Sequence, residues 1–94
     1  MTELQIGNIT HALGLNYRKI PFRNRYNTGN NIDESWENLV QKEYATKRVT
    51  CMELGGCYYH LSKKGLQYVL DNKDIFGLDG RIKKLDTIYR KANL

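Results

Sequence analysis

The run WENLVQKEYATKR at residues 36–48 carries the pattern that decides the fold. Its first half places apolar residues at spacings of three, one and four, which form one stripe of an amphipathic helix. These residues are Trp36, Leu39, Val40 and Tyr44. The residues that follow are rich in Thr and Val, which favour extended structure. We therefore predict a helix over residues 33–43, capped by Asp33 or Asn31, and a strand over residues 45–53.

A glycine pair separates this strand from a second one. Gly55 and Gly56 supply the positive backbone angles of a tight two-residue hairpin turn, and the return strand covers residues 57–61. Alternate residues of the two strands are predicted to face the core: Thr50, Met52, Leu54, Cys57, Tyr59 and Leu61. Ser62 is placed to cap the next helix, over residues 63–72.

Toward the N-terminus, the pattern predicts one more helix and an irregular segment. Thr2 is placed to cap a helix over residues 3–13, and Gly14 ends it because glycine tolerates the left-handed conformation of a helix end. The next stretch, residues 16–31, contains the only proline and a turn-rich run of Asn, Thr and Gly. An extended segment and a helical turn both stay open for the part over residues 17–26.

At the other end, a linker over residues 73–80 leads to a last helix over residues 81–92. Its apolar stripe consists of Ile82, Leu85, Ile88, Tyr89 and Ala92. This helix is too short to be stable alone, so its stripe must pack on the core or on another subunit. In the second case, we expect a homodimer through Ile82, Leu85 and Tyr89.

The runs at residues 36–48 and 58–66 resemble the second half of a winged-helix domain. In bacterial winged-helix regulators, a helix ends in a phrase of the type Leu-Val-Lys-Glu-Gly-Tyr, a hairpin called the wing follows, and the return strand enters Leu-Thr-Lys-Lys-Gly. This chain has Glu43 in place of that glycine and Ser62 in place of that threonine. The resemblance implies a winged-helix-like α+β domain, with helices, a two-stranded β-hairpin and an additional C-terminal helix.

A wider pattern, over residues 9–70, is similar to small uncharacterised proteins of bacteriophages and prophages. Outside the two runs it rests on three short motifs: HALG at residues 11–14, YR at residues 17–18 and RNRY at residues 23–26. The resemblance implies a winged-helix-like domain over residues 1–72, with residues 73–94 forming a linker and a helix for packing or dimerisation.

Length and charge limit the classes of function. The 94 residues form one small domain, and a hydrophobic content of 40% argues against intrinsic disorder. The net charge of +5 permits an anionic partner. The charges are distributed unevenly. Residues 1–31 contain four basic side chains and one acidic, residues 32–44 contain one basic and four acidic, and residues 45–70 contain four basic and one acidic.

The first basic part interleaves aromatic and basic residues over 17–26. Arginine offers a bidentate fork to phosphate, and aromatic rings stack on bases or on guanidinium planes. Cations around the hairpin and the following helix would position the protein on DNA without reading its sequence. The predicted nucleic-acid-binding residues are Arg18, Lys19, Arg23, Arg25, Lys47, Arg48, Lys63 and Lys64. The opposite interpretation is that these side chains are merely solvated and the neighbouring rings fill the core.

Two functions follow. The first is a phage or prophage DNA-binding protein, a transcriptional regulator that contacts double-stranded DNA through the basic segment and the wing. The second is a phage accessory or anti-defence module that binds a host protein. The helix over residues 33–43 favours the second function, because its four carboxylates can mimic nucleic-acid phosphates or meet a basic partner. If this helix entered a DNA groove, the same carboxylates would face the phosphates. Trp36 in this helix is predicted to be a core residue.

Other classes of function find little support. With a two-residue turn, Cys51 would lie opposite His60, so Cys51 and Cys57 would not meet in a disulfide. A zinc site from these residues and His11 lacks paired-ligand spacing. No phosphate loop or nucleophile elbow is present, so we predict no enzyme and no cofactor. The chain has no apolar run of about 18 residues and no secretion signal, which predicts the bacterial cytoplasm and no membrane contact.

Overall fold

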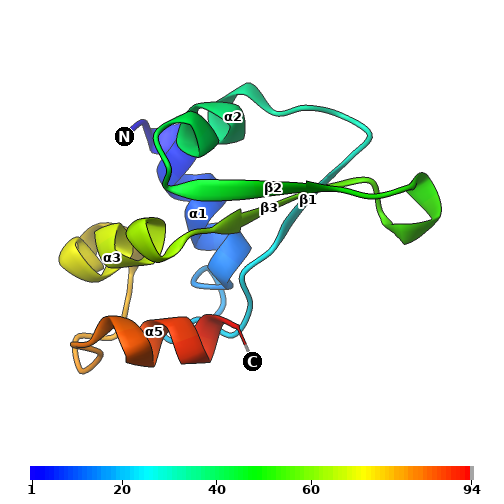
Figure 1. Ribbon diagram of the computed structural model, residues 1–94. Helices are drawn as coiled ribbons and strands as arrows, with labels where there is room; N and C mark the ends of the chain where they lie inside the picture. Colours follow the sequence, from blue (N-terminus) through cyan, green and yellow to red (C-terminus); the bar gives the residue numbers. More distant parts are fainter. Residues whose placement is uncertain (94) are drawn as a thin grey trace.

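Three antiparallel strands form the centre of the fold, and helices pack around them (Figure 1). The computed structural model describes residues 1–93, which form a mixed α+β protein. The strands are β1 (Tyr26–Gly29), β2 (Ala45–Val49) and β3 (Cys57–Leu61). The helices are α1 (Glu3–Leu13), α2 (Glu34–Gln41), α3 (Lys63–Asp71), α4 (Lys73–Phe76) and α5 (Leu85–Ala92), and a 3-10 turn, η1 (Met52–Leu54), lies in the hairpin. The strand order β1–β3–β2 leaves β1 and β2 at the edges.

The predicted starts of three helices are confirmed by their caps. The Thr2 hydroxyl accepts a hydrogen bond from the Gln5 amide at 3.1 Å, and the Gln5 side chain accepts one from the Thr2 amide at 3.0 Å. This reciprocal pair is a capping box. The Asp33 carboxylate accepts from the Trp36 amide at 3.1 Å, and Ser62 caps α3 in the same way.

The sheet contains a strand that the sequence pattern did not predict. β1 lies within the stretch expected to be irregular, and Tyr26 pairs with Tyr59 of β3. The expected two-stranded hairpin is therefore part of a three-stranded sheet. The hydrogen-bond partner of β1 lies about thirty residues away in the sequence, and tertiary pairing of this kind leaves a weak local signal.

The hairpin loop is longer than the predicted two-residue turn. β2 ends at Val49, which lies opposite Cys57, so residues 50–56 form the loop. The Thr50 amide donates to the Gly56 carbonyl at 2.7 Å, and the Thr50 hydroxyl accepts from the Gly56 amide at 3.1 Å. These bonds close the loop at its base, and Figure 1 shows it projecting beyond the helices.

This loop overturns the predicted strand over residues 45–53 and its pairing. His60 lies opposite Thr46 and not opposite Cys51. The expected core face is correct for β3, where Cys57, Tyr59 and Leu61 are buried. It is wrong for Met52 and Leu54, which are exposed because the 3-10 turn breaks the alternation.

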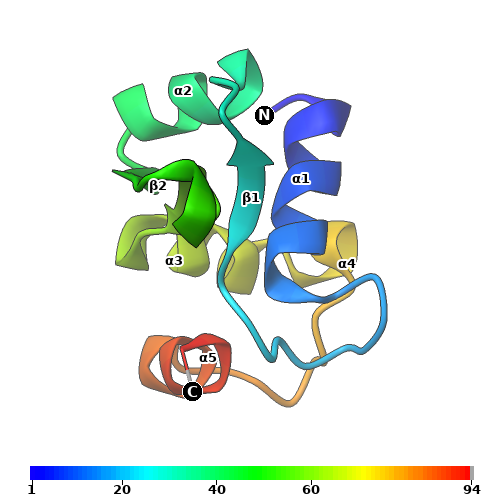
Figure 2. The same cartoon turned by 90° about the vertical axis from the view of Figure 1, so that its right-hand side faces the viewer.

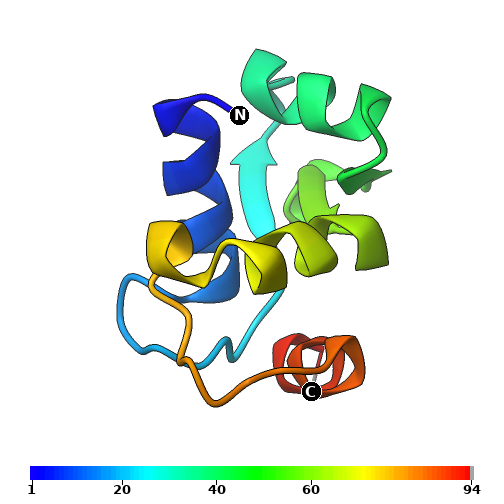
Figure 3. The ribbon, with the colours of Figure 1, turned by 90° about the vertical axis from the view of Figure 1, so that its left-hand side faces the viewer.

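The C-terminal part packs on the rest of the chain (Figure 3). The predicted linker over residues 73–80 contains the short helix α4, and α5 begins four residues later than predicted. Ile82, Ile88 and Ala92 are buried in the same core as the residues of α1 and α3. Leu85 packs partly against this core, while Tyr89 remains 43% exposed.

Trp36 is the centre of the core, as predicted. Its ring is fully buried, with the ring of Tyr59 stacked on it at 5.5 Å between centroids and the ring of Tyr26 at 5.3 Å. The helices α1, α2 and α3 contribute Ile9, Leu13, Leu39, Leu66 and Val69 to the same cluster.

The loop that joins α1 to β1 runs beside the C-terminal end of α5 (Figure 2). Asn24 fixes it there. The buried Asn24 amide group donates to the Leu61 carbonyl at 3.0 Å and accepts from the Leu61 amide at 2.7 Å. One side chain thereby replaces a pair of strand hydrogen bonds and holds the basic loop against the end of β3.

Candidate nucleic-acid interface

The outer face of the sheet, which points away from the core, carries a cluster of basic side chains. Along β3, Tyr58 and His60 alternate with the buried residues and therefore point outward. Arg48 of β2 lies opposite Tyr58, and the Arg25 guanidinium lies 6.0 Å from the centroid of the Tyr58 ring. With Thr50 and Leu54, these residues line a hollow of about 270 Å³, which we call the sheet-face hollow.

The two arginines of this hollow disfavour a positive charge on its histidine. Burial lowers the pKa of His60, and the positive charges of Arg48 and Arg25 lower it further. Within residues 1–93, the ion pairs are Lys47 with Glu37 and Arg81 with Asp79, so neither arginine of the hollow has a carboxylate partner. An anion in the hollow would relieve this repulsion.

The loop before β1 carries a second cluster, in which guanidinium groups and aromatic rings alternate. The Arg18 guanidinium lies 4.8 Å from the centroid of the Phe22 ring. That of Arg23 lies 5.3 Å from the Phe22 ring and 5.6 Å from the Tyr17 ring. We call this group of four side chains the arginine–aromatic ladder. Its spacings are those of cation–π contacts.

Two local features hold the ladder in place. Gly14 has a φ of 77°, and a Cβ at this position would lie 2.3 Å from the Phe22 ring, so the ring rests directly on the backbone at the end of α1. Arg23 donates to the His11 carbonyl from Nε at 3.1 Å and from Nη2 at 2.6 Å. Arg23 therefore also stabilises the C-terminal end of α1.

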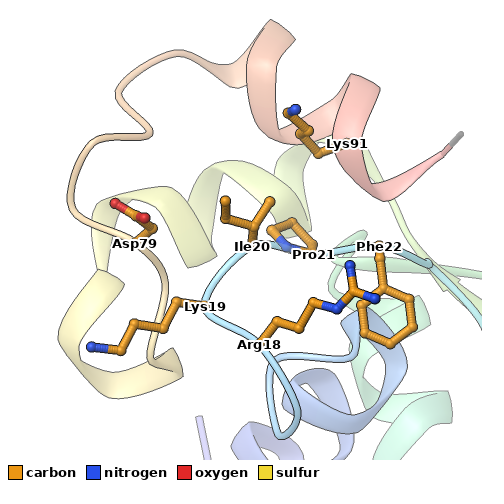
Figure 4. A pocket seen from close by; sticks show the side chains of 7 residues that line it. All are labelled: Arg18, Lys19, Ile20, Pro21, Phe22, Asp79 and Lys91. Carbon is orange, nitrogen blue, oxygen red and sulfur yellow. The ribbon is translucent and has the colours of Figure 1, made fainter.

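Figure 4 shows the third part of the surface, a hollow of about 410 Å³ beside the ladder. Its lining residues are Arg18, Lys19, Ile20, Pro21, Phe22, Asp79 and Lys91. The one carboxylate, Asp79, is already engaged: hydrogen bonds from Arg81 lower its pKa to about 2. The hollow thus keeps a basic rim around an apolar floor.

The parts join into one surface. A further hollow is lined by Phe22 and Arg23 of the ladder and by Arg25 and His60 of the sheet face. Because neighbouring hollows share lining residues, they form a continuous strip, which we call the basic band. Its cationic members are Arg18, Lys19, Arg23, Arg25, Arg48 and Lys91, with His60 between them.

The structure brings together five of the eight predicted nucleic-acid-binding residues. The other three lie elsewhere. Lys47 points to the opposite face of the sheet and forms an ion pair with Glu37 at 2.9 Å. Lys63 lies over the Tyr89 ring at 5.0 Å, and Lys64 donates to the Lys42 carbonyl at 3.0 Å. The basic band thus lacks these three predicted residues, and its members come from the sheet, the first loop and Lys91 of α5.

Three members of this surface were missed at the level of sequence. Tyr58 and His60 sit on β3 with period two, so the outward alternation of that strand was the available signal. Lys91 reaches the band only because of the way α5 packs, and no local sequence pattern predicts this position.

Two carboxylates on and beside the helix α2 form hydrogen bonds within the protein. The Asp33 carboxylate caps the helix, and Glu37 accepts hydrogen bonds from the Tyr59 hydroxyl at 2.7 Å and from Lys47. These bonds lower the pKa of Glu37, with the Tyr59 hydroxyl making the larger contribution. The Asn38 side chain accepts a hydrogen bond from Gln5 of α1 at 2.9 Å.

The cysteines lie in different environments. Cys51 is exposed on the hairpin loop, Cys57 is buried in β3, and both thiols are free. Across residues 1–93, no three His, Cys, Asp or Glu side chains gather as a metal site would require. No helix in that part of the chain has the length and apolarity needed to cross a membrane.

Comparison of the chain with models of known protein families, with curated proteins and with solved structures gave no match.

Proposed function

We propose that the protein is a small DNA-binding protein that contacts phosphates through the basic band. In this proposal it is a transcriptional regulator of the phage or prophage type, with a winged-helix-like fold, and acts in the cytoplasm of a bacterial host. The observation that carries the proposal is the convergence of Arg25, Arg48 and His60 on one outward face, where neither arginine forms an ion pair within residues 1–93.

Two features support a winged-helix-like fold. The order of elements is helix, strand, helix, hairpin, helix, and the strand before α2 pairs with the second strand of the hairpin. In addition, Glu43 has a φ of 68°. This is the position where the winged-helix phrase has glycine, and a left-handed turn explains why glycine is usual there.

The proposed contact surface differs from groove entry by a recognition helix. Glu34 and Glu43 are exposed on and beside α2, and both would repel phosphates. The basic band lies mainly on the other side of the sheet, so DNA there avoids these carboxylates. Contacts by arginine to phosphate position a protein on DNA and give little sequence discrimination by themselves.

The engagement of Asp33 and Glu37 weakens the alternative of a host-protein partner bound by α2. A helix that mimics phosphates needs free carboxylates, and two of its four are occupied within the protein. If the experiment below detects no DNA binding, that result would favour this alternative.

The test is the salt dependence of binding to a blunt duplex. If four cations of the basic band each contact one phosphate, the slope of log K against log salt is about −3.6. Arg25→Gln with Arg48→Gln should reduce the size of this slope by about 2. The matched control is Lys83→Gln with Lys84→Gln, which removes the same charge from exposed positions outside the basic band. No binding at low salt, or equal slopes for both double variants, would overturn the proposal.

A further inference from the structure

The basic band exposes more aromatic surface than phosphate binding requires. Tyr17 is 72% exposed and Phe22 is 37% exposed. By contrast, Trp36 and Tyr59 are fully buried. The guanidinium groups alone are enough to bind phosphate oxygens. The exposed rings therefore indicate a ligand that has further atoms to contact an aromatic surface.

The rings are held in a fixed order. The Arg23 guanidinium lies between Tyr17 and Phe22, and its hydrogen bonds to the His11 carbonyl fix its position. Phe22 rests on Gly14, where any side chain would collide with it. The ladder is therefore built before a ligand arrives, which reduces the ordering cost of binding.

The outer end of the ladder is open. Arg23 approaches the Tyr17 ring at 5.6 Å, and the high exposure of this ring leaves surface free for a second planar group. A flat, π-rich group flanked by phosphates would match both the ring and the neighbouring cations. Nucleobases have these properties, but in a duplex their faces are covered by the adjacent base pairs.

We propose that the arginine–aromatic ladder stacks unpaired bases, so that the preferred ligand is DNA with a single-stranded segment next to a duplex. This inference rests on the proposed function, because it uses the basic band as the path of the phosphate backbone. The duplex part lies against Arg25 and Arg48, and the unpaired part passes along the shared hollow to Phe22. From there it reaches the Tyr17 ring, which contacts the same Arg23 guanidinium as Phe22.

The experiment compares a blunt duplex with the same duplex carrying a short unpaired thymine tail, at one salt concentration. Stacking on an aromatic side chain contributes about 1–3 kcal/mol per base, so the tail should tighten binding by about tenfold. Tyr17→Leu should abolish the difference in affinity between the tailed and the blunt duplex, while Tyr17→Phe should retain it. Tyr89→Leu is the matched control, since Tyr89 is an exposed tyrosine outside the basic band.

A fluorescent base analogue in the tail gives a second readout, because stacking on Tyr17 should quench it. The inference fails if the tail adds no affinity, or if Tyr17→Leu keeps the gain. It fails separately from the proposed function when the blunt duplex still binds with a slope that depends on Arg25 and Arg48. If neither DNA binds at low salt, both proposals fall together.

Discussion

Tyr58 and Tyr59 are neighbours on β3, yet they belong to two different surfaces. Tyr59 is fully buried, stacks on Trp36 and donates its hydroxyl proton to Glu37 at 2.7 Å. Burial and this hydrogen bond raise its pKa. Tyr58 is half-buried, donates to the Leu54 carbonyl at 2.9 Å and carries the Arg25 guanidinium over its ring.

The contrast extends to their surroundings. On the inner face, the acidic and basic groups are paired, as Lys47 and Glu37 show. On the outer face, the positive charges of Arg48 and Arg25 help to lower the pKa of His60, and neither arginine forms an ion pair within residues 1–93. Stability is concentrated on one side of the sheet and unbalanced charge on the other, which is the arrangement expected when the second side has a ligand.

The strongest test of this contrast is Trp36→Ala. Removing a fully buried tryptophan should lower the free energy of unfolding by about 3–5 kcal/mol, because a large cavity opens between Tyr26 and Tyr59. Tyr58→Ala on the outer face should cost about 1 kcal/mol or less. Urea denaturation measures both, and similar losses for the two variants would remove the distinction between the faces.

Tyr59→Phe addresses the polar part of the inner face. It removes the hydroxyl that donates to Glu37 and accepts from the Asp33 amide, and we expect a loss of about 1–3 kcal/mol at neutral pH. The pKa of Glu37 is lowered in the folded state, so its contribution is present above its ordinary pKa of 4.5 and is lost as the pH falls through the folded value. The difference between wild type and variant should therefore shrink in acid. A difference that stays constant with pH would contradict this role of Glu37.

The turn that sets which β2 residues face inward gives the next largest effect. Glu43 occupies a left-handed conformation with a φ of 68°, which disfavours residues with a side chain. Glu43→Gly should raise the free energy of unfolding by about 0.5–1 kcal/mol. Lys42→Gly, at the adjacent position with a φ of −85°, should lower it. Thermal unfolding compares the two, and changes of the same sign would refute the explanation.

Arg48→Gln should have the smallest effect on stability, within about 0.5 kcal/mol, because the side chain is exposed. Its effect on His60 should be clear, because the positive charge of Arg48 contributes more than that of Arg25 to lowering the pKa of this histidine. We expect that pKa to rise in the variant. An NMR titration of His60 measures this change, and an unchanged titration would show that Arg48 does not act on this histidine.

The parts of the fold that local chemistry specifies could be predicted from the sequence. Thr2, Asp33 and Ser62 start their helices through hydrogen bonds to amides only three residues away. β1 and the length of the hairpin loop could not be predicted, because they depend on pairing with β3 and on bonds between Thr50 and Gly56.

The candidate site was predictable to a similar degree. Arg18, Arg23 and Arg25 were predicted from their aromatic neighbours in the sequence. The contacts of Arg18 and Arg23 with Phe22 are local, whereas Arg25 contacts Tyr58 of β3. Lys47 was grouped with Arg48, although successive residues of a strand point to opposite faces. The strand register places Lys47 beside Glu37 and Arg48 in the sheet-face hollow. The longer loop determines this register.

The strand order has a consequence for the time course of folding. β2 and β3 are separated only by residues 50–56, whereas β1 must close a loop over residues 30–56 to reach β3. Loop-closure entropy favours the shorter connection, so we expect the hairpin to form first and β1 to join it later. Pulsed hydrogen exchange should protect the amides of β2 before those of β1, and the reverse order would refute this. A newly synthesised chain would then complete its sheet-face hollow only in the last stage of folding, when Arg25 reaches its place beside Tyr58.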